Sequence, residues 1–248
     1  MSSYNPLGTP FIELPSVDST NNYAMGLVRA GMAHHGTAVF AHEQTKGRGQ
    51  RTKEWSSEGG KNIAISFIIE PELISTQQIF FLSMAMAVGT LNFFNNLTGN
   101  EALIKWPNDI YWRDRKAAGI LIQNIWQGNS WKYAVVGIGI NVNQVEFGLL
   151  GTRAVSLKQI KGKEENPLHL ARELGNYLED SYQLLKNDPA AIATLYRKQL
   201  YKLNQPVKLK TENRIFEAVI IGVSDLGQLE VNTDKTERFD VGEVEWII

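Results

Sequence analysis

Two apolar runs decide the fold: residues 117–126 read AAGILIQNIW, and residues 131–142 read WKYAVVGIGINV. Gly128, Asn129 and Ser130 lie between them. A short connection of this composition between two apolar runs is typical of a β-hairpin, because glycine and asparagine tolerate the backbone angles of tight turns. We therefore predict one long antiparallel hairpin in this part of the chain.

Apolar patterning on the N-terminal side of this hairpin predicts further strands and two helices. Ser19 and Thr20 precede a stripe of apolar residues at helical spacing, and Gly31 follows it, which is typical of a capped helix. The run NIAISFII is almost continuously apolar, which indicates a strand buried on both faces. The predicted strands are 37–41, 62–69, 102–106 and 110–112, and the predicted helices are 20–30 and 76–97.

The C-terminal side predicts two helices and then a change of architecture. Helices are expected over 167–186, with a proline near the start, and over 189–202. From residue 206 the chain alternates apolar and polar residues in short runs separated by Gly, Asn and Asp, which is typical of a small antiparallel barrel or sandwich. We therefore predict an α/β domain over 1–203 and an all-β domain over 204–248.

Composition limits the class of protein. The 248 residues are 43% hydrophobic, 10% aromatic and 21% charged, which is an ordinary globular balance. A formal net charge of -1 gives no sign of nucleic-acid binding, and the absence of cysteine excludes disulfides, thiolate nucleophiles and cysteine metal sites. Residues 1–10 do not resemble a signal peptide, and no run of about 18 apolar residues is present, so we expect a soluble, cytoplasmic protein without a membrane partner.

The segment 44–55, QTKGRGQRTKEW, is the most informative for function. Two glycines permit close approach of the backbone to a ligand, four Lys and Arg residues concentrate positive charge, and Trp55 ends the segment with a large aromatic face. Backbone N–H groups, cations and a stacking ring together suit a nucleotide or another anion. Taken alone, a solvated surface loop explains the segment better, because Gly/Arg loops are common.

Three further motifs place polar groups at the ends of predicted strands. KWPND at 105–109 suits a phosphate and its metal, although an ordinary turn explains the same residues. RKAAGIL at 115–121 puts Lys116 where a polar turn becomes a buried strand, so its amine lies either at a pocket wall or at the surface. GIGIN at 137–141 removes two side chains from a strand where something else must approach closely, but it lacks the third glycine of a dinucleotide fingerprint.

In their order along the chain, these motifs together with DSTN at 18–21 closely resemble biotin–protein ligases. The resemblance covers most of the predicted α/β domain, and the small C-terminal β domain also fits that family. It implies a mixed sheet with flanking helices, the class II aminoacyl-tRNA synthetase-like catalytic domain of biotin ligases, followed by a small SH3-like β-barrel. The implied reaction activates biotin with ATP and Mg²⁺ to biotinyl-5′-AMP, and then transfers biotin to a lysine of a biotin carboxyl carrier protein.

The resemblance also implies roles for individual residues. Lys116 and Arg48 are expected to be catalytic, and Asp109 is expected to contact Mg²⁺. The residues expected to bind biotin are Ser19, Thr20, Asn21, Gln44, Gly47, Arg48, Lys116, Gly119, Gly137 and Ile140. The residues expected to bind ATP are Gly49, Arg51, Lys53, Trp55, Lys105, Asn108 and Asn141, with Trp55 stacked on the adenine ring.

Two features depart from the family pattern or limit it. Many relatives read Arg-Arg-Gly after GRG, whereas this chain has Gln50, Arg51 and Thr52, and the missing charge at 50 bears on how tightly the loop retains the adenylate. The DSTN motif begins at residue 18, which leaves no space for the N-terminal helix-turn-helix domain that some members carry. Repression of biotin genes is therefore not expected.

Three alternatives remain open from the sequence. A lipoate- or octanoate-transferring relative would have the same fold but a different glycine-rich loop, and GRGQR and KWPND argue against it. A non-catalytic biotin-binding module would not need the groups for phosphate chemistry that Lys116, Arg48 and Asp109 provide. A nucleic-acid binder is disfavoured by the net charge. Relatives often dimerise through a sheet edge, so a homodimer is a further possibility.

Overall fold

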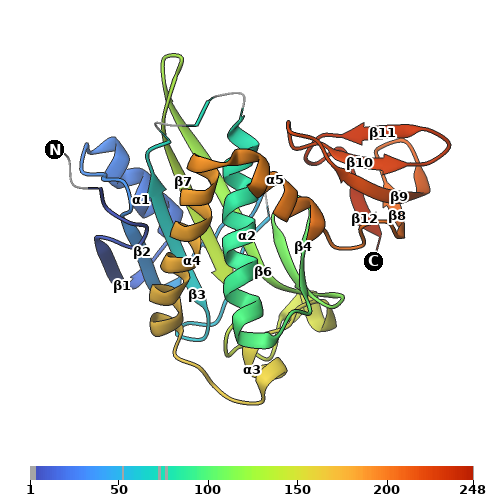
Figure 1. Ribbon diagram of the computed structural model, residues 1–248. Coiled ribbons are helices and arrows are strands. Elements are labelled where there is room, and N and C mark those ends of the chain that lie inside the picture. Colours follow the sequence, from blue (N-terminus) through green and yellow to red (C-terminus); the bar gives the residue numbers. More distant parts are fainter. Residues whose placement is uncertain (1–3, 52, 72–73, 76–77, 248) are drawn as a thin grey trace.

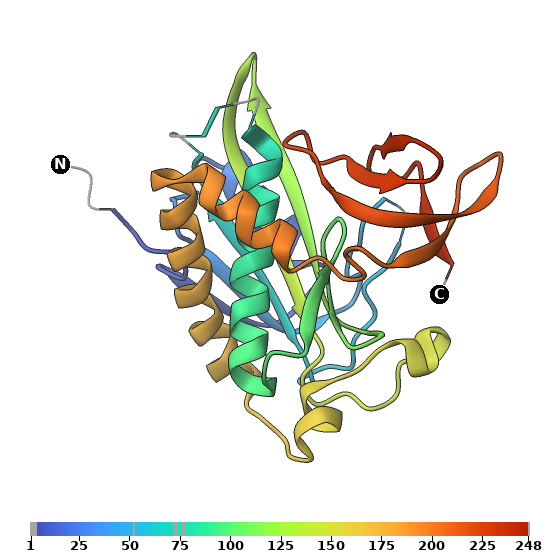
Figure 2. The same cartoon turned by 45° about the vertical axis from the view of Figure 1, so that its right-hand side comes forward.

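The computed structural model describes residues 4–51, 53–71, 74–75 and 78–247. It contains a seven-stranded mixed sheet with helices on both faces and a separate five-stranded antiparallel sheet at the C-terminal end. Figures 1 and 2 show the smaller sheet beside the end of the larger sheet that carries β4. The predicted fold class, α/β with a small second β unit, is confirmed, whereas the exact boundary between residues 203 and 204 stays a prediction.

The larger sheet is built around the predicted hairpin. Strands β6 (Arg115–Gln127) and β7 (Ser130–Ile140) pair along almost their whole length, and Gly128 takes a left-handed backbone conformation in the turn. The strand order is β1-β2-β3-β7-β6-β5-β4, in which only β1 and β2 run parallel. The other five strands of this sheet are β1 (Phe11–Val17), β2 (Ala38–Gln44), β3 (Ile63–Ile69), β4 (Ala102–Lys105) and β5 (Asp109–Trp112).

Three helices cover one face of this sheet and form the main core. They are α2 (Ile79–Thr98), α4 (Pro167–Asn187) and α5 (Pro189–Lys198), which lie in front of the strands in Figure 1. Every residue of β3 is buried, as its apolar run predicts. Phe67 and Ile69 point toward these helices and Ile68 toward the opposite face, because side chains alternate along a strand.

The opposite face is only partly covered, which leaves room for a site. Helix α1 (Thr20–Arg29) packs there on β2, β3 and β7 through a small apolar cluster that contains Ala24, Val39 and Ile68. Beyond the N-terminal end of α1 the sheet is exposed to a pocket rather than to a helix.

The smaller sheet has the order β11-β10-β9-β8-β12 and is fixed to the larger unit by specific contacts. Trp106 Nε1 donates a hydrogen bond to the Gly227 carbonyl at 2.9 Å, and a Cβ atom at Gly227 would collide with the Phe80 ring. Its strands are β8 (Pro206–Lys210), β9 (Ile215–Val223), β10 (Leu229–Asn232), β11 (Thr236–Phe239) and β12 (Glu245–Ile247).

Several elements differ from the sequence predictions. Strand β1 is not among the predicted strands. Its sequence FIELPSV contains a proline, which an edge strand tolerates because one side of its backbone has no partner strand. Two short helical segments were also missed, η2 (Gly148–Arg153) and α3 (Leu157–Lys161), the second of which begins with a Ser156–Gln159 capping box. Helix α5 ends at residue 198 rather than 202, and residues 76–77 of the predicted helix 76–97 lie outside the described residues.

Helix α2 is long and apolar enough to span a membrane by length and composition, a property that the sequence prediction did not anticipate. In the structure 67% of its apolar window is buried inside the protein. Most of its residues are apolar because α4, α5 and the sheet pack against it.

Two helical glycines provide a matched test of this packing. Gly89 of α2 faces α4 so closely that a Cβ atom would lie 2.8 Å from the Tyr177 carbonyl oxygen, whereas a Cβ atom at Gly26 of α1 would meet nothing within 4 Å. We expect Gly89→Ala to lower the free energy of unfolding, because overpacking costs about 1–3 kcal/mol and exceeds the gain in helix propensity. Gly26→Ala should raise it by about 0.5–1 kcal/mol. Urea denaturation followed by circular dichroism measures both, and equal shifts of the two midpoints would contradict the packing described.

Candidate active site

A cavity of about 380 Å³ lies on the sheet face that α1 leaves open. Its floor is formed by β6 and β7, one end by the start of α1, and its cover by residues 48–50 and 53–56. Trp246 of the C-terminal sheet forms part of the wall, so both sheets contribute to the cavity. The volume is in the range of small-molecule sites.

One end of the cavity is a buried polar recess. Thr20 at the start of α1 donates from its backbone N–H to Gln44 Oε1 at 2.8 Å, and its hydroxyl lies 3.1 Å from the same oxygen. Ser66 of β3 is fully buried, and its hydroxyl oxygen lies within hydrogen-bond distance of Thr20 Oγ1 and Asn21 Oδ1, at 2.7 and 2.6 Å. Asn21 Nδ2 donates to Gln123 Oε1 at 3.0 Å. This network fixes the orientation of each polar group that faces the recess.

Glycines on neighbouring strands flatten the floor of the cavity. Gly137 leaves space for Asn21, because a Cβ atom there would lie 2.1 Å from Asn21 Oδ1. Gly139 is paired with Gly119 across β6 and β7, and the Trp55 ring lies on both: their Cβ atoms would be 2.4 and 3.2 Å from it. The glycines of GIGIN are therefore required by close approach, as predicted.

Ile140 does not line the cavity. Side chains alternate along β7, so the residue next to Gly139 points to the other face, where Ile140 is fully buried in the main core. The expectation that Ile140 shapes the floor is therefore wrong for this structure, and Gly139 takes that position.

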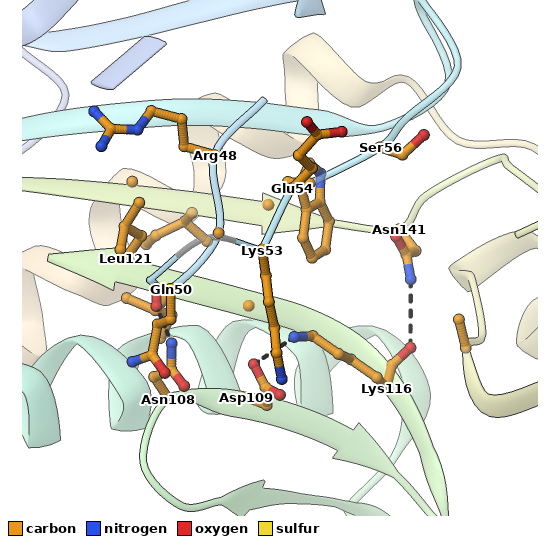
Figure 3. A pocket seen from close by; sticks show the side chains of 18 of the residues that line it. Arg48, Gln50, Lys53, Glu54, Ser56, Asn108, Asp109, Lys116, Leu121 and Asn141 are labelled. Atoms are coloured by element: carbon orange, nitrogen blue, oxygen red, sulfur yellow. Dashed lines mark hydrogen bonds and ion pairs between the residues drawn. The ribbon is translucent and has the colours of Figure 1, made fainter. Parts of the chain in front are cut away.

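Three lysines surround one carboxylate at the other end of the cavity. Lys116 Nζ on β6 lies 2.6 Å from Asp109 Oδ1 on β5, and Lys105 lies at the end of β4. Figure 3 shows Lys53 extending from the cover toward the same carboxylate. Burial lowers the pKa of Lys105 to about 8; Asp109 opposes this shift, whereas Lys116 and Lys53 add to it. The cluster has more positive than negative charge, so it favours an anionic ligand.

The side-chain amides of Asn108 and Asn141 hold the backbone of this cluster in place. Asn141 Nδ2 donates to the carbonyls of Lys116 and Val155 at 3.3 and 3.1 Å. Asn108 Nδ2 donates to the carbonyl of Ile120 on the same strand. Both asparagines line the cavity, but their amide donors are used to position β6, and their expected contact with ATP stays a prediction.

Residues 47–51 and 53–55 pair with each other over the cavity, and we call these residues the glycine hairpin. Gly49 N–H donates to the Lys53 carbonyl at 2.8 Å, and Trp55 N–H donates to the Gly47 carbonyl at 3.0 Å. Gly47 does not line the cavity but is needed for this pairing, since a Cβ atom there would lie 2.2 Å from the Trp55 carbonyl oxygen. Thr52 lies outside the described residues.

The two arginines of the glycine hairpin point away from the lysine cluster. Arg48 is exposed at the rim and donates to Asn22 Oδ1 at 3.0 Å, so the two residues expected to be catalytic, Arg48 and Lys116, are not together in this structure (Figure 3). Arg51 does not line the cavity and contacts the C-terminal sheet.

Trp55 covers the floor with one polar atom unused. Its Nε1 is buried and has no hydrogen-bond partner among the described residues. The Lys116 ammonium lies 5.7 Å from the centre of the ring, which is within cation–π range. In this structure the ring lies on the sheet rather than at an open stacking position, so its expected contact with adenine stays a prediction.

The remaining predicted residues line the cavity together with several that the sequence did not indicate. Ser66 and Gln123 orient the polar recess without a motif of their own, and Trp246 is far from the other site residues in sequence. Two further cavity residues, Phe147 and Arg153, come from a segment with no recognisable pattern. The predicted residues that line the cavity are Ser19, Thr20, Asn21, Gln44, Arg48, Gly49, Lys53, Trp55, Lys105, Asn108, Asp109, Lys116, Gly119, Gly137 and Asn141.

The described residues contain no group of three or more acidic or histidine side chains that could by itself hold a metal ion. Asp109 is already paired with Lys116 through one oxygen. Mg²⁺ commonly binds through one or two carboxylates and the phosphates of a nucleotide. The site therefore fits a magnesium ion that arrives with a nucleotide, and does not fit one held by protein alone.

Comparison with known proteins gives consistent results. The model of the biotin/lipoate A/B protein ligase family matches residues 13–141, just over half of the chain, and that of the biotin protein ligase C-terminal domain matches residues 202–246. A bifunctional ligase/repressor BirA from Bacillus spizizenii is 28% identical over 233 residues, which are 92% of this chain and 71% of the relative. A biotin–acetyl-CoA-carboxylase ligase from Paracoccus denitrificans is 29% identical over 226 residues, covering 87% and 91%.

The fold comparison gives the same group of proteins. The structure of a biotin protein ligase from Aquifex aeolicus in complex with biotin and ATP superposes with a TM-score of 0.80 at 25% identity, covering 96% of this chain and 99% of the other.

The charge balance of the lysine cluster can be tested directly. We expect Asp109→Asn to lower the pKa of Lys105 below about 8, because the carboxylate is the group that favours its ammonium form. Lys116→Met should raise it by removing a like charge. Asp114→Asn, at a cavity carboxylate that pairs instead with Lys202, is the control and should leave the pKa near 8. Side-chain NMR titration measures the values, and an unchanged pKa in Asp109→Asn would contradict the arrangement.

Proposed function

The chain belongs to the biotin/lipoate A/B protein ligase family, and on that premise we propose how its cavity carries out biotin–protein ligation. The activity is that of an ATP-dependent ligase that activates biotin and transfers it to a protein lysine. The observation that carries the proposal is a single cavity with a neutral polar recess at one end and a lysine cluster at the other. Such a cavity suits a ligand with a hydrogen-bonding head and an anionic tail.

The polar recess is proposed to hold the ureido head of biotin. Thr20, Asn21 and Gln44 offer both hydroxyl and amide groups there, and Ser19 lies beside them. A urea group has N–H donors and a carbonyl acceptor, so it requires both kinds of partner. The glycine floor at Gly119 and Gly139 provides the flat apolar surface along which the ring and chain of biotin would lie, once the Trp55 ring moves aside.

The lysine cluster is proposed to be the reaction centre. A biotin carboxylate oxygen attacks the α-phosphorus of ATP, the bond from that phosphorus to the bridging oxygen breaks, and pyrophosphate leaves with the electron pair. Both reactants are anions, so they approach only where Lys116, Lys105 and Lys53 offset their charge. Lys116 is proposed to contact the carboxyl and phosphoryl oxygens, because its ammonium lines the cavity between Asp109 and the Trp55 ring that covers the floor.

The second step needs an acceptor amine. The neutral ε-amine of the acceptor lysine attacks the acyl carbon of the mixed anhydride, the bond to AMP breaks, and the amine loses a proton as the amide forms. A biotin carboxyl carrier domain is the partner that the family implies. Homodimerisation, cytoplasmic location and the absence of nucleic-acid or membrane partners stay predictions.

Mg²⁺ is proposed to enter with ATP as part of the substrate. When bound, it would neutralise phosphate charge and orient the leaving group. The second oxygen of Asp109 is the protein ligand that the site offers for it, while Asn108 and Asn141 keep the surrounding backbone fixed. The lipoate or octanoate alternative is not favoured, because the curated relatives and the solved structures named above are biotin ligases.

The function is tested by mixing the protein with biotin, Mg-ATP and a biotin-accepting carrier domain. Mass spectrometry of the carrier should show one biotin added to a lysine, and biotin should stimulate exchange between ATP and pyrophosphate. Lipoate and octanoate in place of biotin are the controls and should give neither product. Absence of both transfer and exchange would overturn the proposal.

The role of Lys116 gives a sharper prediction. Lys116→Ala, or Lys116→Met to preserve packing, should reduce the rate of ATP–pyrophosphate exchange by about 10²–10³-fold, the usual loss for one preorganised electrostatic partner. Lys158→Ala removes a surface lysine that pairs with Glu164, and it should leave the rate unchanged. A Lys116 variant with the full exchange rate would remove this residue from the reaction centre.

A further inference from the structure

The tip of the glycine hairpin contacts the C-terminal sheet through Arg51. Its guanidinium donates from Nη1 to the Gly242 carbonyl at 3.1 Å and from Nη2 to the Val241 carbonyl at 2.9 Å. These residues form the turn between β11 and β12. Two adjacent carbonyl oxygens match the planar fork of an arginine side chain better than the single ammonium of a lysine.

The turn that receives Arg51 is shaped for this contact. A Cβ atom at Gly242 would lie 1.3 Å from Nη2 and 1.7 Å from Cζ of Arg51, so the guanidinium occupies the space that any other residue would fill. Gly242 also has a φ of 91°, and Arg51 itself has a φ of 58°, a left-handed conformation that is uncommon for a residue other than glycine. Both sides of the contact therefore depend on special backbone conformations.

The contact lies between groups that face the cavity. On one side, Lys53 and Trp55 follow Arg51 in the glycine hairpin and line the cavity. On the other side, Trp246 follows Gly242 in the chain and also lines the cavity, with the centre of its ring 5.2 Å from Lys105 Nζ. Fixing Arg51 to Gly242 thus fixes two parts of the cavity wall to each other.

We propose that Arg51 is a positioning residue that holds the glycine hairpin against the C-terminal sheet, so that Lys53 is kept at the lysine cluster for adenylate formation. The inference rests on the proposed function for its kinetic part but not for its structural part. It replaces the expectation that Arg51 binds phosphate. In this structure Arg51 is directed to neutral carbonyls outside the cavity, while Lys53 extends into it.

A double-mutant cycle of Arg51→Ala and Gly242→Ala tests the contact. Each single change should lower kcat/KM for ATP in the exchange reaction by about tenfold, the scale of one or two hydrogen bonds from a charged donor. The double variant should be no worse than the worse single variant, because both changes break one interaction. Any loss of kcat/KM that comes from backbone strain at Gly242 alone is the same with and without Arg51→Ala, so it cancels in the cycle. Multiplicative losses would overturn the proposal.

A conservative variant separates positioning from phosphate binding. If Arg51 bound phosphate, Arg51→Lys would keep the charge and most of the activity. If it acts through two carbonyls, Arg51→Lys should be close to Arg51→Ala. Arg238→Ala, which removes an exposed arginine paired with Glu230 on the same sheet, is the control and should behave as the unchanged protein.

A readout without substrates separates this inference from the function itself. Endoproteinase Glu-C cleaves after Glu54, which is exposed within the glycine hairpin and is unaffected by the substitutions. Cleavage at this bond should be about tenfold faster in Arg51→Ala and in Gly242→Ala than in the unchanged protein or Arg238→Ala. Equal cleavage rates would overturn the inference even in an active ligase, and faster cleavage would support it even if no biotin were transferred.

Discussion

The site is organised around a partly buried cluster of three lysines and one carboxylate, which carries a net positive charge. Lys105, Lys116 and Lys53 face one carboxylate, that of Asp109, and burial already lowers the pKa of Lys105 to about 8. Concentrated like charges destabilise the ligand-free protein, so this arrangement persists only because the backbone around it is held rigidly. The phosphates and carboxylate of the proposed substrates would supply the missing negative charge.

That rigidity comes from the face of the sheet that takes no part in the chemistry. Lys105, Asp109 and Lys116 lie on β4, β5 and β6, whose other face packs under α2, and only Lys53 comes from the glycine hairpin. Asn108 and Asn141 add hydrogen bonds from side chain to backbone at the ends of these strands. The apolar core and the polar site are thus two faces of one sheet, and the precision of the second depends on the packing of the first.

Much of this could be predicted from the sequence, and the failures have physical reasons. The motifs KWPND and GIGIN each place several cavity residues within five consecutive positions, so the local sequence is enough to indicate them. The expected role of Ile140 comes from the family resemblance, whereas the alternation of side chains along β7 puts Ile140 in the core and its neighbour Gly139 on the cavity face. Ser66 and Trp246 could not be found this way, since a buried serine in an apolar strand and a distant tryptophan acquire their positions only through tertiary packing.

The direction of Arg51 illustrates the same limit. Its position in a cationic, glycine-rich segment indicates an anion site, but the side chain reaches carbonyls that lie about 190 residues further along the chain. This long separation also matters for how the protein is made. Residues 206–247 leave the ribosome after the whole seven-stranded sheet, and N-terminal units generally fold first. The nascent chain therefore has its polar recess and lysine cluster before it has a closed wall, and the final strands of the smaller sheet complete the cavity.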